Sequence, residues 1–121
     1  MKVIIDLIED IRESIANAED FVLTVGLLKQ DTSDVDKLVY AGEAAIRSFV
    51  LDEEKKELHF AVGSSDVEVT VGELIPSLLI LDMKKMMYPL KIDVNTAYRG
   101  LEIVGFGKSE EDKKYMLFIV V

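Results

Sequence analysis

The chain has 121 residues, with 14 lysines and arginines against 23 aspartates and glutamates, so its formal net charge is −9. Half of the residues are hydrophobic, which supplies enough apolar surface to offset the entropy of ordering the chain and excludes intrinsic disorder. The length fits a single domain over residues 1–121, and the negative charge argues against nucleic acid or an anionic membrane as a partner.

The sequence lacks cysteine, which excludes disulfides, thiolate metal sites and cysteine nucleophiles. The first residues meet an acid at Asp6, so they lack the uninterrupted apolar stretch of a secretory signal. No apolar run approaches the roughly 20 residues of a membrane span. We therefore expect a cytoplasmic protein.

Apolar residues recur at helical spacing near the N-terminus, and acidic residues occupy most of the remaining circumference. This spacing predicts an amphipathic helix over residues 2–17. The next apolar run, residues 21–28, is rich in β-branched residues and too short for a typical helix, so it predicts a strand covered on both sides. Residues 29–34 are polar and predict a turn.

Residues 35–51 allow two interpretations. Ser33 followed by Asp36 resembles a helix-capping pair, whereas Gly42 interrupts the helical spacing and its flanks have strand-like composition. We favour two strands over this segment. The charged residues 52–56 then separate two short apolar runs and predict a hairpin.

The spacing of the apolar residues changes near Gly72. Before it, residues 67–71 alternate and predict a half-buried strand. After it, apolar residues recur at helical spacing, and proline is tolerated only in the first turn of a helix. Pro76 therefore places the start of a second principal helix, which covers about residues 74–87 and ends before Pro89.

Residues 90–94 alternate as a strand should, and two further strands, 100–106 and 115–121, flank a charged loop. The last strand is too apolar to lie at an open edge without aggregating, so we expect it to be central in the sheet or paired across a dimer. Together the elements predict an α+β fold, with a mainly antiparallel sheet of about 6–7 strands and the helices 2–17 and 74–87 packed on one face.

Two segments have the outline of a ligand-binding motif but lack its required residues. Residues 105–109 contain Gly-Lys-Ser, yet Glu102 stands where a phosphate-binding loop needs glycine, and a strand follows instead of a helix. Three aspartates within residues 31–36 resemble a calcium loop, but Leu38 and Val39 occupy positions that need an oxygen ligand and a glycine. We therefore predict hairpin glycines in the first segment, a solvated turn in the second, and neither a metal nor a cofactor.

His59 is the only histidine, which excludes a multi-histidine metal site and makes it the required base of any Ser-His-Asp arrangement. Its apolar neighbours, Leu58 and Phe60, predict an ordinary strand position. Pairs among 23 acidic residues occur by chance, so spacing alone identifies no acid–base pair. The motifs assign no catalytic residue and give enzyme activity no support.

Two segments hold residue types that are common in binding surfaces. Methionines and lysines crowd the end of the predicted second helix, and a tyrosine and an arginine lie in a polar loop after residue 94. Methionine at helical spacing is also typical of a core, and such a loop is also typical of a plain surface turn. The candidate binding residues are Met83, Lys84, Lys85, Met86, Met87, Tyr98 and Arg99.

These features predict a non-catalytic binding or regulatory module that acts through protein contacts and forms a homodimer. A small ligand-binding protein or enzyme with a pocket near Tyr98 and Arg99 is the first alternative. An acidic decoy that occupies a basic site on another protein is the second, and its capture of a partner would weaken steeply with salt.

Overall fold

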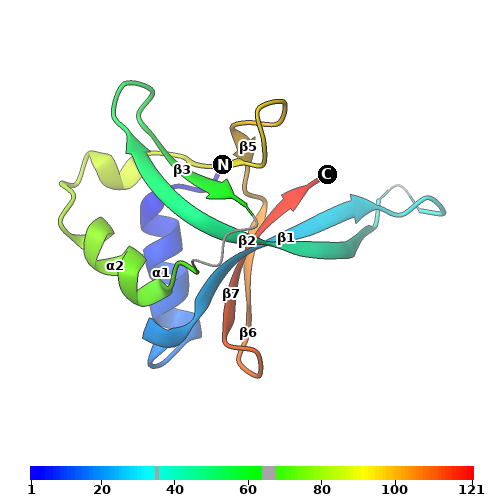
Figure 1. Ribbon diagram of the computed structural model, residues 1–121, viewed down its shortest axis with the longest axis horizontal. Helices are drawn as coiled ribbons and strands as arrows, with labels where there is room; N and C mark the ends of the chain where they lie inside the picture. Colours follow the sequence, from blue (N-terminus) through cyan, green and yellow to red (C-terminus); the bar gives the residue numbers. More distant parts are fainter. Residues whose placement is uncertain (35, 64–67) are drawn as a thin grey trace.

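The computed structural model describes residues 1–34, 36–63 and 68–121. Along this part of the chain, two helices precede three strands, and two further helices precede the last four strands (Figure 1). The helices are α1 (Ile4–Ser14), η1 (Ala18–Asp20), α2 (Val71–Leu79) and η2 (Lys85–Met87), of which η1 and η2 are single 3₁₀ turns. The strands are β1 (Val22–Gln30), β2 (Leu38–Asp52), β3 (Glu57–Val62), β4 (Leu90–Asp93), β5 (Leu101–Glu102), β6 (Gly105–Ser109) and β7 (Lys114–Val120).

The strands form one seven-stranded sheet in the order β5-β4-β3-β2-β1-β7-β6. The β1–β7 and β3–β4 pairs are parallel, and the other pairs are antiparallel. The sheet curls, and α1 and α2 lie on the same side of it (Figure 1). The predicted α+β class is confirmed, and the two parallel pairs make the sheet mixed.

The segment that we expected to form two strands is one long strand, β2. Its first half pairs with β1, and its second half pairs with β3 from Ile46 onwards. Gly42 carries the strand through the expected break, because it takes a φ of +131°, which favours glycine, beside a shift in the β1–β2 register. The prediction of two strands was therefore wrong, and Val35, the first residue of that segment, lies outside the described residues.

Helix α1 is shorter than the predicted 2–17. It begins after Val3, whose N–H donates to the Asp6 carboxylate at 2.9 Å, and it ends before Ile15, which is extended. Asn17 then takes a left-handed φ of 59°, which turns the chain towards η1. The apolar face of α1 is buried against the sheet through Ile4, Leu7, Ile8 and Ile11.

Helix α2 begins three residues earlier and ends much earlier than the predicted 74–87. The Thr70 side chain accepts from the Glu73 N–H and caps the helix, so Val71 lies in its first turn rather than in the predicted strand 67–71. Val69 still accepts a backbone hydrogen bond from the β1 residue Leu23, whereas Val67 lies outside the described residues. Pro76 is therefore inside the helix and not at its start.

Strand β7 lies between β1 and β6, as expected for so apolar a sequence. The Phe118 ring covers Gly26 on β1 and Gly107 on β6. A Cβ atom at Gly26 would lie 2.5 Å from this ring, and one at Gly107 would lie 2.6 Å from it. Both edges of this apolar strand are thus paired with strands of the same chain. The homodimer stays a prediction.

One buried hydrogen bond ties β7 to α1. The Tyr115 hydroxyl is fully buried and donates to the Asp10 carboxylate at 2.6 Å. Burial, reinforced by this hydrogen bond, raises the pKa of Tyr115 far above its ordinary value of 10.0.

None of the described helices is both long and apolar enough to cross a membrane.

The raised pKa of Tyr115 predicts a loss of stability in alkali. The buried hydroxyl of Tyr115 contributes fully to the stability of the fold below pH 10.0, the ordinary pKa of tyrosine. Above that pH the contribution is progressively lost, because the hydroxyl ionises in the unfolded chain but not in the folded one. The free energy of unfolding should fall by up to about 1.4 kcal/mol for each pH unit above that value. Urea unfolding at several pH values measures this slope.

The Tyr115→Phe variant should lack that part of the slope. It should also lose about 1.5–3 kcal/mol at neutral pH, because its hydrogen bond goes to a charged acceptor. Tyr98→Phe changes an exposed tyrosine and serves as the matched control. An identical alkaline slope in Tyr115→Phe and the wild type would contradict the assignment.

Candidate functional site

Arg47 lies at an irregularity in β2. The register with β3 shifts between Ile46 and Ser48, so Arg47 is an extra residue that the ladder leaves unpaired. Such a bulge bends the strand and re-aims a side chain. The Arg47 side chain lies over Gly63, where an added Cβ would stand 2.6 Å from its Cδ atom.

A chain of hydrogen bonds crosses β3 and β4 beside this bulge. His59 is buried on β3, with Nδ1 2.9 Å from Asp93 Oδ2 on the parallel neighbour β4. Its Nε2 lies 2.9 Å from Glu57 Oε1 on the same strand. Both ring nitrogens are therefore occupied, and the histidine links two partly buried carboxylates.

Asp93 also fixes the loop that follows β4. Its Oδ1 accepts from the Gly100 N–H at 2.8 Å, and Gly100 has a left-handed φ of 66°. The Asn95 side chain accepts from the N–H groups of Ala97 and Tyr98 and closes a tight turn. These contacts hold the loop over the carboxyl ends of β3 and β4.

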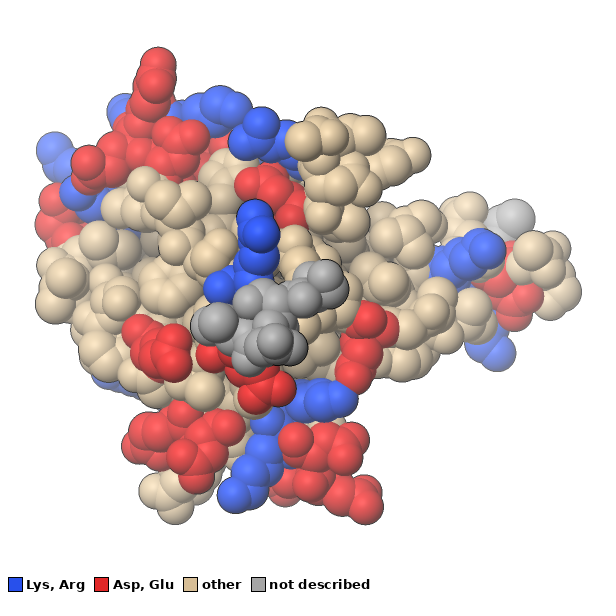
Figure 2. All heavy atoms as spheres, viewed as in Figure 1, with Lys and Arg blue, Asp and Glu red and all other residues tan. Residues whose placement is uncertain are grey.

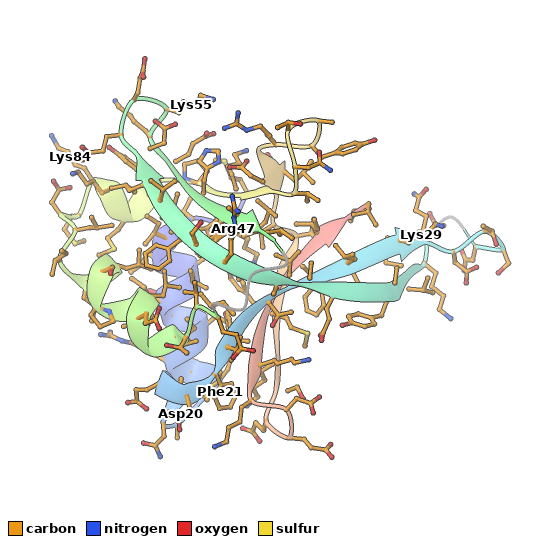
Figure 3. The ribbon with its side chains drawn as sticks, viewed as in Figure 1. Asp20, Phe21, Lys29, Arg47, Lys55 and Lys84 are labelled. Carbon is orange, nitrogen blue, oxygen red and sulfur yellow. The ribbon has the colours of Figure 1, made fainter. Side chains whose placement is uncertain are left out.

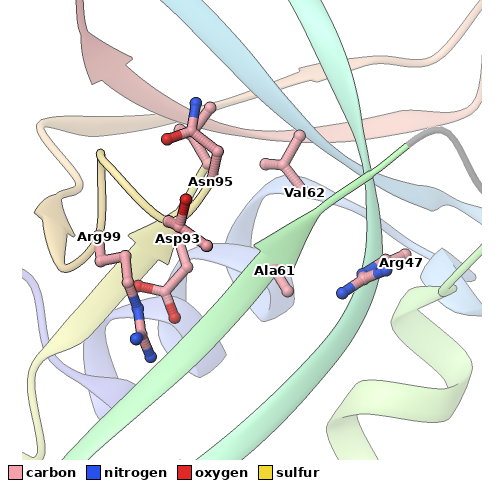
Figure 4. Close-up of a pocket in the computed structure, with 8 residues that line it drawn as sticks. Arg47, Ala61, Val62, Asp93, Asn95 and Arg99 are labelled. Atoms are coloured by element: carbon pink, nitrogen blue, oxygen red, sulfur yellow. The ribbon is translucent and has the colours of Figure 1, made fainter.

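A cavity of about 340 Å³ lies at this end of the two parallel strands. Figure 4 shows Arg47 and Arg99 on opposite sides of it, with Asp93 and Ala61 between them. Arg47 comes from the β2 bulge and Arg99 from the loop after β4. The residues lining the cavity are Arg47, Ala61, Val62, Asp93, Val94, Asn95, Thr96 and Arg99.

The cavity combines two positive charges with one negative charge. Within the described chain, neither Arg47 nor Arg99 has an ion-pair partner. The two oxygens of Asp93, by contrast, already accept from His59 and Gly100. Figure 3 places Arg47 near the centre of the face shown in Figure 2, on which acidic side chains lie both near the centre and at the edges.

This arrangement is suited to binding an anion. A guanidinium presents a planar fork of donors that matches a carboxylate or a phosphate. His59 is not among the residues lining the cavity, so it supports Asp93 instead of facing a ligand. Among the described residues, no group of three or more His, Cys, Asp or Glu side chains could hold a metal ion.

The structure separates the predicted binding residues. Arg99 lines this cavity, whereas the adjacent Tyr98 lines a second one. Met86 is buried in the core, while Met83 and Met87 are exposed. These methionines belong to η2 and the segment before it, not to α2.

The two candidate lysines lie apart from the cavity. Lys85 forms an ion pair with Glu53 of the β2–β3 hairpin loop. Lys84 lies at the edge of the molecule in Figure 3, well away from Arg47 in that view. Neither lysine lines the cavity that Arg99 lines.

The two motif-like segments take ordinary local structure. Residues 105–109 form β6, which pairs with β7 as a hairpin. In the acidic turn, Asp31 accepts from the N–H and the hydroxyl of Ser33, and Asp34 accepts from the N–H of Asp36. These bonds account for the turn-forming role of its aspartates.

The chain has no match among known protein-family models, curated proteins or solved structures. A function for the site therefore rests on the chemistry of its residues.

Arg47, Asp93 and Glu57 were not among the residues predicted from the sequence. One signal was present: Ile46 and Phe49 both pack towards the core although they are three residues apart. A regular strand would place such residues on opposite faces, so this spacing indicates a bulge. The pairing of His59 with Asp93 had no local signal, because it depends on the β3–β4 register.

Loss of the histidine should destabilise the fold measurably. His59→Ala leaves Glu57 and Asp93 partly buried without their shared partner, so the free energy of unfolding should fall by about 1–3 kcal/mol. Val50→Ala is the matched control, because Val50 pairs with His59 across the ladder but is exposed. Chemical denaturation measures the free energy of unfolding of both variants. Equal losses in the two would show that the link between His59 and the carboxylates contributes nothing to stability.

Proposed function

We propose that the protein is a non-catalytic binding module for a small ligand that carries a carboxylate or phosphate group. The observation that carries this proposal is the pair Arg47 and Arg99, which face one cavity from opposite sides without an ion-pair partner among the described residues. This proposal develops the alternative of a ligand pocket near Tyr98 and Arg99.

The electrostatics of the chain support an anion at this place. The protein carries a formal charge of −9, so two arginines in one cavity stand out against an acidic background. The charges of the two arginines outnumber that of Asp93 in the cavity, and an anionic ligand would balance the excess positive charge. The neutral lining residues Asn95 and Thr96 add donors and acceptors that can orient the ligand.

Arginine substitutions should weaken anion binding. With succinate and inorganic phosphate as probes, Arg47→Gln and Arg99→Gln should each weaken binding about tenfold or more, because each removes a charge-assisted contact. Isothermal titration calorimetry measures the affinity, which should also fall as salt concentration rises.

Arg12→Gln is the matched control. Arg12 is exposed on α1 and does not line the cavity, so this variant should bind as the wild type does. Equal weakening in all three variants would indicate a non-specific charge effect. If the wild-type protein binds neither phosphate nor any carboxylate, the proposal is wrong.

Self-association through protein contacts is a second candidate. Four large apolar side chains within residues 79–87 are exposed. Single exposed apolar residues are common on protein surfaces, but several in one short segment are typical of an interaction surface. Their exposed fractions are 48% for Leu79, 85% for Ile80, 82% for Met83 and 62% for Met87. We call these four residues the apolar patch, and they support the homodimer better than β7 does, because β7 lies inside the sheet.

Charges in the apolar patch should prevent dimer formation. Ile80→Glu together with Met83→Glu should convert a dimer into a monomer, because pairing would then bury like charges. Analytical ultracentrifugation at micromolar concentration measures the mass. Val50→Glu changes another exposed apolar residue and is the control. A wild-type protein that sediments as a monomer would refute the homodimer.

A further inference from the structure

A second cavity adjoins the one that the arginines line. It has a volume of about 400 Å³ and a lining without charged side chains. Its walls come from the loop after β4, from β5 and from the end of β7. The residues lining it are Val94, Tyr98, Leu101, Val120 and Val121.

Two observations join the cavities into one region. Val94 lines both of them. Tyr98 and Arg99 are consecutive residues of one turn, yet Arg99 faces the charged cavity and Tyr98 the apolar one. The turn is held by the Asn95 side chain and by the hydrogen bond from the Val94 N–H to the Tyr98 carbonyl, at 2.9 Å. A charged end and an apolar end are therefore fixed side by side.

We infer that the ligand is an amphiphilic anion, a carboxylate with an acyl chain. Its carboxylate lies between Arg47 and Arg99, and its chain lies against Val94, Leu101 and Tyr98. This inference rests on the proposed function, because it uses the same arginines, and it names the ligand class. Charge complementarity fixes the orientation of the ligand, because its carboxylate pairs with the arginines and its acyl chain is better buried against the apolar lining of the second cavity.

The exposure of the apolar walls supports this occupant. Tyr98 is 63% exposed and Val120 is 41% exposed, so both present apolar surface to water. An acyl chain that covers them removes this surface from water, and each buried methylene should strengthen binding about fourfold. A ligand without a chain leaves the second cavity unused.

The inference is tested by a series of straight-chain carboxylates. Acetate, butanoate, hexanoate and octanoate are titrated below their micelle concentrations into the wild-type protein. Shifts of the backbone amide signals of residues 95–100 in two-dimensional NMR spectra report binding, including weak binding. Affinity should rise about fourfold per added methylene and level off once the second cavity is filled.

Variants of each cavity separate the two contributions. Arg99→Gln should weaken binding of every member of the series by a similar factor. Tyr98→Ser and Val121→Ser should flatten the dependence on chain length while acetate binding stays unchanged. Val50→Ser changes an exposed apolar residue of β2 that lines neither cavity, so it is the control and should change neither the affinity nor its dependence on chain length.

Each outcome decides one of the two claims. If succinate and acetate bind but affinity is independent of chain length, the amphiphile is wrong and the anion site stands. If octanoate binds and Arg47→Gln and Arg99→Gln leave its affinity unchanged, the inferred orientation is wrong. If no carboxylate binds and phosphate also fails, the proposed function itself is wrong.

Discussion

Strand β2 is the element on which the rest of the structure depends. Its first half pairs with β1, which leads on to β7 and β6, and its second half pairs with β3, which leads on to β4 and β5. A regular ladder of 15 residues would stay nearly straight between its partners, so the irregularities near Gly42 and at Arg47 give it the bend that both halves need. The same bend forms the concave side on which the helices bury their apolar residues.

Sequence patterns predicted the elements whose structure is decided locally. The spacing in α1, the alternation in β4 and the charged loops between hairpin strands each follow from a few neighbouring residues. Patterns failed where a distant contact decides the outcome. Gly42 continues a strand because β1 supplies the hydrogen bonds. Pro76 lies inside α2 for a local reason that the apolar spacing did not reveal, because the Thr70 cap starts the helix early.

The candidate site divides in the same way. The loop after β4 was recognisable by composition, and Arg99 was among its candidate residues. Arg47 and Asp93 reach the cavity from other strands, through a bulge and through a parallel register that no local pattern encodes. Tyr98 was grouped with Arg99 by adjacency, yet a single turn directs the two side chains into different cavities. Composition can therefore mark a loop as a candidate binding segment, but the direction of each side chain depends on the fold.

The ring of Phe118 makes three distant positions interdependent during sequence divergence. Any side chain larger than hydrogen at Gly26 or Gly107 would collide with this ring. A change at one of these positions is therefore tolerated only after residue 118 has become smaller. Homologues of this protein should fall into two groups, one with an aromatic residue over two glycines and one with a small residue beside larger neighbours, and an intermediate between them would be poorly folded.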